Sequence, residues 1–444
     1  MIFSPFNFKN LGDVKAECEK LGLNLHFSEN LEILKRKVNV NGVTIHNSLA
    51  VHPMEGSDGN EDGSPGELTI RRSLRNARGG AGLIWFEAIA VVPEGRASTH
   101  QLMINQENKD NFKKLVEDMR SEARKSNDQD FELVIIAQLT HSGRFSRPKG
   151  ILEPVIGCHD PHMDTKYNVS PDAPIVTDDK LEALEDKFVE AARLAKEVGF
   201  DGVDIKGCHK YLASELLGAF TREGKYGGTF EGRTRFLLNI VDKVRKAVGD
   251  KFIIGSRLNI YDGIPYPYGF GVDKEDVNKF DESEPLKLTG KLREKGVNII
   301  NVTMGTPYLN PHVNRPFDKG GYIPNEHPLE GVARLANGIE KMQKAYPDLP
   351  IVGTGYSWLR EFSPYLAAGS LENGNATLIG YGRQGIAYPD FAKDILAGGL
   401  KRNKCCISCS KCADLLRTGQ HSGCVVRDSE IYAPIYVKKF KNNA

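Results

Sequence analysis

The side chains best suited to chemistry stand together near the middle of the chain, at the end of an apolar stretch that is predicted to form a strand (200–206). They are Lys206, Cys208, His209 and Tyr211. Lys206 and His209 can each donate a hydrogen bond to a carbonyl oxygen. Tyr211 is a phenol that can deliver a proton and stay bound as its conjugate base. This set indicates acid–base chemistry on a carbonyl-bearing substrate; the other interpretation is a strand end whose polar side chains simply reach solvent.

Alternating strands and helices must position this group. The clearest helix is predicted at 178–198, where apolar residues recur at three- and four-residue steps. Thr177 can cap its start and Gly199 its end, and the strand at 200–206 follows at once. This rhythm is typical of a parallel barrel. The eight predicted strands are 48–54, 81–92, 133–139, 200–206, 252–258, 297–303, 351–353 and 376–380.

The predicted fold class is therefore α/β, a (βα)8 TIM barrel followed by a short cysteine-rich segment. The chain has 444 residues, and such a barrel uses about 250 residues or more as one unit. We expect an N-terminal segment (1–44), the barrel (45–400) and a cysteine-rich tail (401–444). Within the barrel, the loop 55–66 is rich in glycine and acidic residues and predicts a solvated turn.

Composition narrows the class of protein. The net charge is +1, from 59 basic and 58 acidic residues, so the overall balance does not favour nucleic acid or a membrane surface as a partner. No run of about 18 apolar residues occurs, and residues 1–10 lack the layout of a signal peptide. Five of the eight cysteines crowd into 405–424, which is cofactor spacing and not a disulfide framework. We expect a soluble, cytoplasmic protein.

Three segments carry a resemblance to a known family. Residues 200–236 are similar to a "DGVEIHGAHGYL" strand followed by "R-x-D-x-YGGS-x-x-NR-x-RF"; residues 81–96 are similar to "GLIIVEATAVTPEGR", and 138–144 (QLTHSGR) to "QLxHxGR". These motifs belong to the old yellow enzyme family of flavin-dependent oxidoreductases. The resemblance covers roughly 48–428 and implies FMN held non-covalently at the mouth of the barrel.

The resemblance also implies which residues touch the flavin. Gln138 would bond the pyrimidine edge, and Arg257 would stand beside the N1 and O2 atoms, where a cation stabilises the reduced ring. Ala88 matches a small residue that lets the ring approach the backbone. Glycines after the last two strands, together with an arginine, suit a phosphate group. The full set of predicted cofactor residues is Pro53, Met54, Ala88, Gln138, Arg257, Gly355, Gly382 and Arg383.

The tail raises the question of a second cofactor. Cys406, Cys409, Cys412 and Cys424 resemble the cluster loop of the branch that contains 2,4-dienoyl-CoA reductase and trimethylamine dehydrogenase, with one residue fewer between the second and third cysteines. Four thiolates suit a [4Fe–4S] cluster, which the resemblance favours, and they also suit a structural zinc ion. That branch normally continues into FAD- and NAD-binding domains, and this sequence contains no strand-flanked G-x-G-x-x-G. Electrons are expected from NAD(P)H or from a separate electron-donor protein.

These residues predict an ene-reductase. Reduced flavin would pass a hydride to the activated C=C bond of a small α,β-unsaturated carbonyl or carboxylate compound. Lys206 and His209 would hold the oxygen, and Tyr211 would protonate the α-carbon; the lysine charge favours an anionic substrate. The alternatives are a flavin-dependent amine dehydrogenase or demethylase, and a non-catalytic flavin and iron–sulfur electron carrier. A homo-oligomer is possible.

Overall fold

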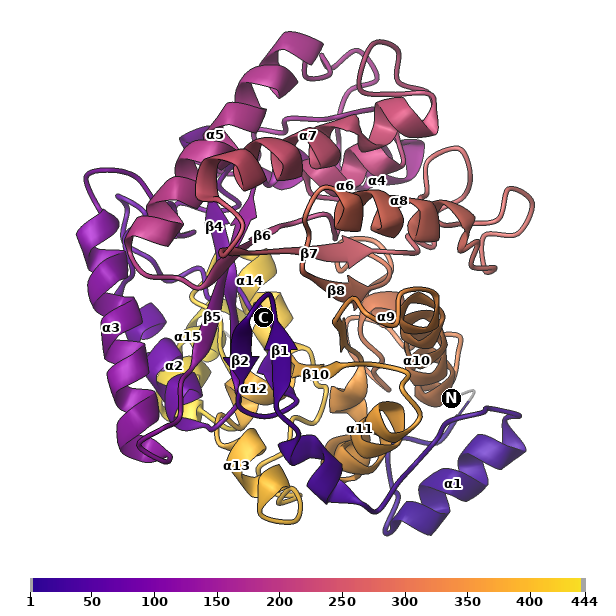
Figure 1. The fold of residues 1–444 in the computed structure, drawn as a ribbon. Coiled ribbons are helices and arrows are strands. Elements are labelled where there is room, and N and C mark those ends of the chain that lie inside the picture. Colours follow the sequence, from indigo (N-terminus) through magenta and orange to yellow (C-terminus); the bar gives the residue numbers. More distant parts are fainter. Residues whose placement is uncertain (1–2, 441–444) are drawn as a thin grey trace.

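The chain is built on a closed barrel of eight parallel strands (Figure 1). The computed structural model describes residues 3–440, so 1–2 of the predicted N-terminal segment and 441–444 of the predicted tail lie outside the described residues. The strands close in the order β10-β3-β4-β5-β6-β7-β8-β9. They are β3 (Leu49–Val51), β4 (Leu83–Ala90), β5 (Val134–Thr140), β6 (Gly202–Ile205), β7 (Ile253–Asn259), β8 (Ile299–Thr303), β9 (Ile351–Gly353) and β10 (Leu378–Tyr381). Each overlaps one predicted strand, and the barrel prediction is confirmed.

Helices surround the barrel and return the chain from one strand to the next. The longer ones are α2 (Glu67–Arg78), α3 (Lys109–Ser126), α5 (Asp178–Glu197), α7 (Phe230–Val248), α8 (Ser283–Glu294), α10 (Pro328–Ala345) and α11 (Ser363–Glu372). Short helices lie in the loops: α4 (Pro161–Tyr167), α6 (Leu212–Leu217), α9 (Pro311–Asn314), α12 (Arg383–Ala387), α13 (Phe391–Leu396), and the 3-10 turns η2 (Pro93–Gly95), η3 (Gly143–Phe145) and η4 (Tyr356–Phe362). The predicted helix at 178–198 is α5, and the Thr177 side chain accepts the Lys180 N–H at 3.2 Å as its cap.

The N-terminal segment closes one end of the barrel. It contains α1 (Leu11–Lys20), η1 (Leu31–Lys35) and a hairpin of β1 (Val38–Val40) and β2 (Val43–Ile45). The turn residues Asn41 and Gly42 both have positive φ, as a tight hairpin requires. Apolar side chains of the hairpin pack among residues that start the barrel strands, Leu83 and Val134 among them. The carboxyl ends of the strands are left open at the opposite side.

The tail lies at that opposite side, behind the barrel in Figure 1, and forms α14 (Lys411–Arg417) and α15 (Ser429–Phe440). It is fastened to α2 because the Asp428 carboxylate accepts two hydrogen bonds from Arg71, at 2.7 and 2.8 Å. None of the helices in 3–440 is long and apolar enough to cross a membrane.

The prediction of a solvated turn at 55–66 is wrong for most of its length. Ser57, Asp58 and Ser64 are buried, and Asp58 forms an ion pair with Arg72 of α2. Two of the acidic residues that suggested solvent exposure, Glu55 and Asp58, instead pair with buried cations, whereas Glu61 and Asp62 are exposed. The loop therefore belongs to the wall of the barrel mouth.

Candidate active site

A cavity of about 910 Å³, including its open mouth, lies at the carboxyl ends of the strands. This is where barrel enzymes hold their ligands. The predicted residues on its lining are Pro53, Met54, Gln138, Lys206, His209, Tyr211, Arg257, Gly355, Gly382 and Arg383. Ala88 is instead fully buried within β4, next to a register shift, and is not on the lining. Residues on the lining that sequence reasoning missed include His52, Glu55, Tyr308, Asn314 and Arg315.

Gln138, at the floor of the cavity, is oriented by Asp204 of β6. The amide Nε2 donates to Asp204 Oδ2 at 2.6 Å, and Trp85 Nε1 donates to the same oxygen at 2.7 Å. The Arg257 backbone N–H donates to Asp204 Oδ1 at 2.7 Å. This bond uses one of the two amide N–H groups, so the Gln138 oxygen and its second N–H remain to bind a ligand.

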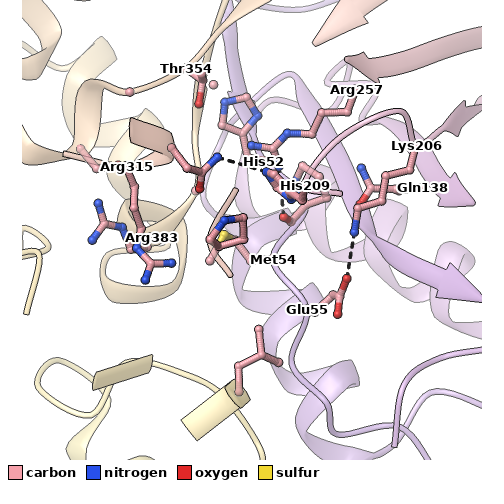
Figure 2. A pocket seen from close by; sticks show the side chains of 18 of the residues that line it. His52, Met54, Glu55, Gln138, Lys206, His209, Arg257, Arg315, Thr354 and Arg383 are labelled. Carbon is pink, nitrogen blue, oxygen red and sulfur yellow. Dashed lines mark hydrogen bonds and ion pairs between the residues drawn. The ribbon is translucent and has the colours of Figure 1, made fainter. Parts of the chain in front are cut away.

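One end of the cavity carries guanidinium groups without carboxylate partners. Arg315 and Arg383 form no salt bridge with any residue in the described part of the chain, and a buried nitrogen of each lacks a hydrogen-bond partner there. Arg257 also has no salt bridge among the described residues, but it lies on the side of Lys206 and Gln138 (Figure 2). Burial, followed by the neighbouring Arg383 charge, lowers the pKa of Arg315 to about 9. Figure 2 shows Arg315 and Arg383 on the same side of the cavity. Cations gathered without counter-charges form a site for an anion.

At the other end, the Lys206 charge is paired. Lys206 Nζ lies 3.1 Å from Glu55 Oε1 (Figure 2) and 3.6 Å from the centroid of the Tyr211 ring. The Tyr211 hydroxyl donates to Glu55 Oε1 at 3.2 Å and lies 2.9 Å from the Tyr308 hydroxyl. Phe145 stacks on Tyr308 with centroids 3.7 Å apart. Burial, then the Glu55 carboxylate, raises the pKa of Tyr211 well above 10, so the phenol keeps its proton.

His209 stands between the two ends in a strained backbone conformation. His209 and Lys210 both have positive φ, 65° and 58°, which side chains other than glycine rarely adopt. Asn314 Nδ2 lies 3.2 Å from His209 Nε2, and also 3.0 Å from Thr303 Oγ1 and 3.1 Å from the Met304 carbonyl. Burial, with the charges of Arg257 and Lys206, holds the pKa of His209 well below 6.5. The ring is thus neutral and carries one N–H that can donate a hydrogen bond.

The four tail cysteines surround a second cavity of about 350 Å³. Cys406, Cys409, Cys412 and Cys424 all line it, as does Arg383, which also lines the main cavity. Backbone N–H groups approach two of the sulfurs: Ser408 N lies 3.4 Å from Cys406 Sγ, and Arg427 N lies 3.3 Å from Cys424 Sγ. Within residues 3–440, no group of three or more His, Cys, Asp or Glu side chains is placed to hold a single metal ion.

The tail also holds the loop that carries Glu55. The Ser422 N–H donates to the Gly56 carbonyl at 2.7 Å, and His421 Nδ1 lies 2.7 Å from the Ser57 carbonyl. The Gly56 N–H donates to Glu87 Oε2 of β4 at 2.9 Å. Gly56, the residue after Glu55, is therefore held by hydrogen bonds from both the barrel and the tail. Through these bonds, the segment that lines the second cavity contacts the loop that lines the first.

The closed barrel of parallel strands places the chain in the class of (βα)8 barrel proteins, with its main cavity at the carboxyl ends of the strands. A family model described as "NADH:flavin oxidoreductase / NADH oxidase family" matches residues 37–284. The chain therefore belongs to the NADH:flavin oxidoreductase family, and the resemblance predicted from its motifs is confirmed.

Individual relatives agree with the family. The chain is 29% identical over 382 residues to NADH oxidase of Thermoanaerobacter brockii, covering 84% of this chain and 52% of that protein. It is 27% identical over 361 residues to NADPH dehydrogenase of Bacillus subtilis, covering 80% and 92%. A solved 2-naphthoyl-CoA reductase shares the fold with a TM-score of 0.71 at 20% identity, covering 89% of this chain and 57% of that one. The chain thus spans about half the length of the NADH oxidase, and it carries the flavin oxidoreductase barrel.

The residues present fit FMN, the cofactor that the family implies. The unpaired guanidinium groups of Arg383 and Arg315 suit a phosphate, and the free oxygen of Gln138 suits a ring N–H. Glycines form part of the cavity wall near the arginines, so the backbone there carries no side chain. A Cβ at Gly382 would meet Met54 Sδ at 3.1 Å, and Gly355 has a φ of +98°, which residues with a side chain rarely adopt. These residues would hold the phosphate, the pyrimidine edge and the face of the ring.

Proposed function

We propose that the protein is an FMN-dependent, NAD(P)H-linked ene-reductase. The observation that carries the proposal is one cavity with two chemically different ends: unpaired arginines at one, and a protonated, buried tyrosine at the other. FMN, when bound, supplies hydride transfer to the activated C=C bond of an α,β-unsaturated compound. The chain itself must then bind the substrate, hold its oxygen and deliver a proton.

The substrate oxygen is held by Lys206 and His209 in this proposal. Lys206 has three N–H donors, and Glu55 accepts from it at one side, so donors remain for a ligand. The neutral His209 offers its one ring N–H to the same oxygen. Two donors aimed at an oxygen stabilise the negative charge that develops there during reduction.

Tyr211 is the proposed acid. Its hydroxyl is buried among Glu55, Tyr308 and the Lys206 ammonium, so it is protonated at neutral pH and shielded from bulk water. The Tyr308 hydroxyl at 2.9 Å is placed to pass a proton back to Tyr211 after turnover. Protonation of carbon by a positioned phenol completes the reduction.

For the tail we propose a [4Fe–4S] cluster bound by Cys406, Cys409, Cys412 and Cys424. The cavity lined by the four cysteines and the N–H groups near two of their sulfurs support a cluster. Four thiolates also suit a structural zinc ion, which metal analysis distinguishes from a cluster. The cluster would accept electrons from a separate redox protein, in addition to the NAD(P)H route.

Anaerobic spectroscopy of the purified protein tests the proposal. We expect a flavin absorbance band that bleaches with NADH or NADPH and returns when cyclohex-2-en-1-one is added. Iron analysis should give about four atoms per chain, because one cluster contains four. Reduction by NAD(P)H without reoxidation by any activated alkene would reject the ene-reductase, and zinc without iron would make the tail a structural site.

A further inference from the structure

The walls of the main cavity contain a single acidic side chain among the described residues that line it, Glu55. Its side chain is 13% exposed, and its partner Lys206 is 4% exposed. The Glu55 oxygens accept from the ammonium at 3.1 Å and from the Tyr211 hydroxyl at 3.2 Å. The carboxylate is thus placed among the groups that receive the substrate.

The position of Glu55 is fixed by the chain on its C-terminal side. The Gly56 N–H is bound by Glu87, and Glu87 in turn forms a buried ion pair with Arg72. The Gly56 carbonyl accepts the Ser422 N–H at 2.7 Å. Because both backbone groups of Gly56 are used, the backbone that carries Glu55 cannot move without breaking hydrogen bonds to two other parts of the fold.

The charge that the pair presents to a ligand differs from that of Lys206 alone. A substrate carboxylate that approached Lys206 would stand beside the Glu55 carboxylate, or would have to displace it and leave a buried charge without a partner. An uncharged carbonyl oxygen needs only one of the remaining N–H donors of Lys206 and leaves the pair intact. Repulsion therefore acts against anionic substrates and not against neutral ones.

We propose that Glu55 selects uncharged α,β-unsaturated aldehydes and ketones over α,β-unsaturated carboxylates. The inference deepens the proposed function and rests on it. It reverses the preference for anions that Lys206 alone suggests, because the Glu55 carboxylate neutralises the Lys206 charge. The sequence does not reveal this pair, since the two residues are 151 positions apart and only the fold brings them together. Glu55 is a specificity-determining residue on the substrate side of the cavity.

The test compares two ring compounds of matched size, cyclohex-2-en-1-one and cyclohex-1-ene-1-carboxylate, in the FMN-loaded protein. The variant Glu55→Gln keeps the shape of the side chain and removes its charge. Glu61→Gln is the matched control, since Glu61 is exposed on the same loop and is not on the cavity lining. We expect the ratio of kcat/KM, ketone over carboxylate, to fall about tenfold or more in Glu55→Gln, which corresponds to at least about 1.4 kcal/mol, and to stay unchanged in Glu61→Gln.

A double variant shows whether Lys206 receives the carboxylate. In Glu55→Gln/Lys206→Met, the gain for the carboxylate should be largely lost. A gain of the same size in the single and the double variant would overturn the role of the pair, and a ratio within twofold of wild type in Glu55→Gln would overturn the inference entirely.

A binding measurement separates this inference from the proposed function. Cyclohexanone and cyclohexanecarboxylate cannot be reduced at a C=C bond, and their dissociation constants can be measured by calorimetry on the oxidised protein. If neither alkene reoxidises the flavin, the proposed function fails. The calorimetric ratio in wild type and Glu55→Gln then still decides whether Glu55 selects by charge.

Discussion

The two ends of the main cavity handle charge in opposite ways. Arg315 and Arg383 present guanidinium groups that no carboxylate in the described chain neutralises, whereas Lys206 is already paired with Glu55. An unpaired buried charge costs free energy until a ligand supplies the counter-charge. A paired one offers hydrogen bonds without attracting an ion. In the proposed function the first arrangement would hold the anionic cofactor, and the second would suit uncharged substrates that must enter and leave.

Tyr211→Phe should have the largest effect, because it removes the proton donor from the paired end and leaves the unpaired end intact. We expect reoxidation of the reduced flavin by cyclohex-2-en-1-one to slow about 10²- to 10⁴-fold, the usual contribution of general acid catalysis. Reduction by NAD(P)H should change little. Rapid-mixing kinetics of each half-reaction measure the two separately, and equal losses in both would show that Tyr211 acts on flavin binding instead.

The double variant Arg315→Met/Arg383→Met tests the other end. Charge-assisted hydrogen bonds contribute about 1.5–3 kcal/mol each, so we expect FMN to bind about 10²-fold more weakly or worse, and the protein to be purified with little flavin. Arg124→Met is the control, because Arg124 is exposed and pairs with Glu132 far from the cavity. Full flavin occupancy in the double variant would contradict an anion site at this end.

Cys412→Ser tests whether Cys412 binds the proposed cluster, and whether the folded tail is needed to hold the loop that carries Glu55. Iron should fall from about four atoms per chain to less than one, since the cluster needs four thiolates. Because the tail also holds Gly56, we expect a further loss of about threefold to tenfold in alkene-driven reoxidation, measured with dithionite-reduced protein so that no electrons need pass through the tail. Unchanged iron content would rule out the assignment of Cys412 as a ligand.

The pH dependence should show the smallest effect. Burial, and then Glu55, raises the pKa of Tyr211 well above 10, so its proton is present throughout the neutral range and is lost only at high pH. Reoxidation in wild type should therefore stay constant up to about pH 10. In Glu55→Gln one cause of the raised pKa is gone, although Tyr308 and Lys206 still face the phenol, and the alkaline loss should begin at lower pH. A decline that starts at the same pH in both proteins would contradict the Glu55–Tyr211 contact.

The barrel could be predicted from the sequence because apolar periodicity and glycine positions are local signals. The predicted strand 351–353 coincides with β9, and Arg257, Gln138 and Tyr211 reach the cavity because each follows or ends a recognisable strand. Glu55 could not be predicted, since its neighbours read as a polar turn and its partner Lys206 is distant in sequence. Its place directly after Pro53 and Met54 was the one local signal available.

Arg315 and Tyr308 were missed for a related reason. Both lie in the long loop after β8, which has no periodic pattern, and only the fold brings Tyr308 to Tyr211. Local patterns predict which strand ends carry chemistry. They do not predict which charged and polar side chains the loops contribute to the same cavity.

The most direct test of the contrast between the two ends is the affinity of the flavin-free protein for FMN and for riboflavin, which lacks the phosphate. The account predicts that FMN binds at least about 10²-fold more tightly than riboflavin, as expected for a phosphate held by two charge-assisted contacts. It also predicts that this ratio is the same in Glu55→Gln, because Glu55 lies at the other end. Equal affinities for FMN and riboflavin would contradict the account.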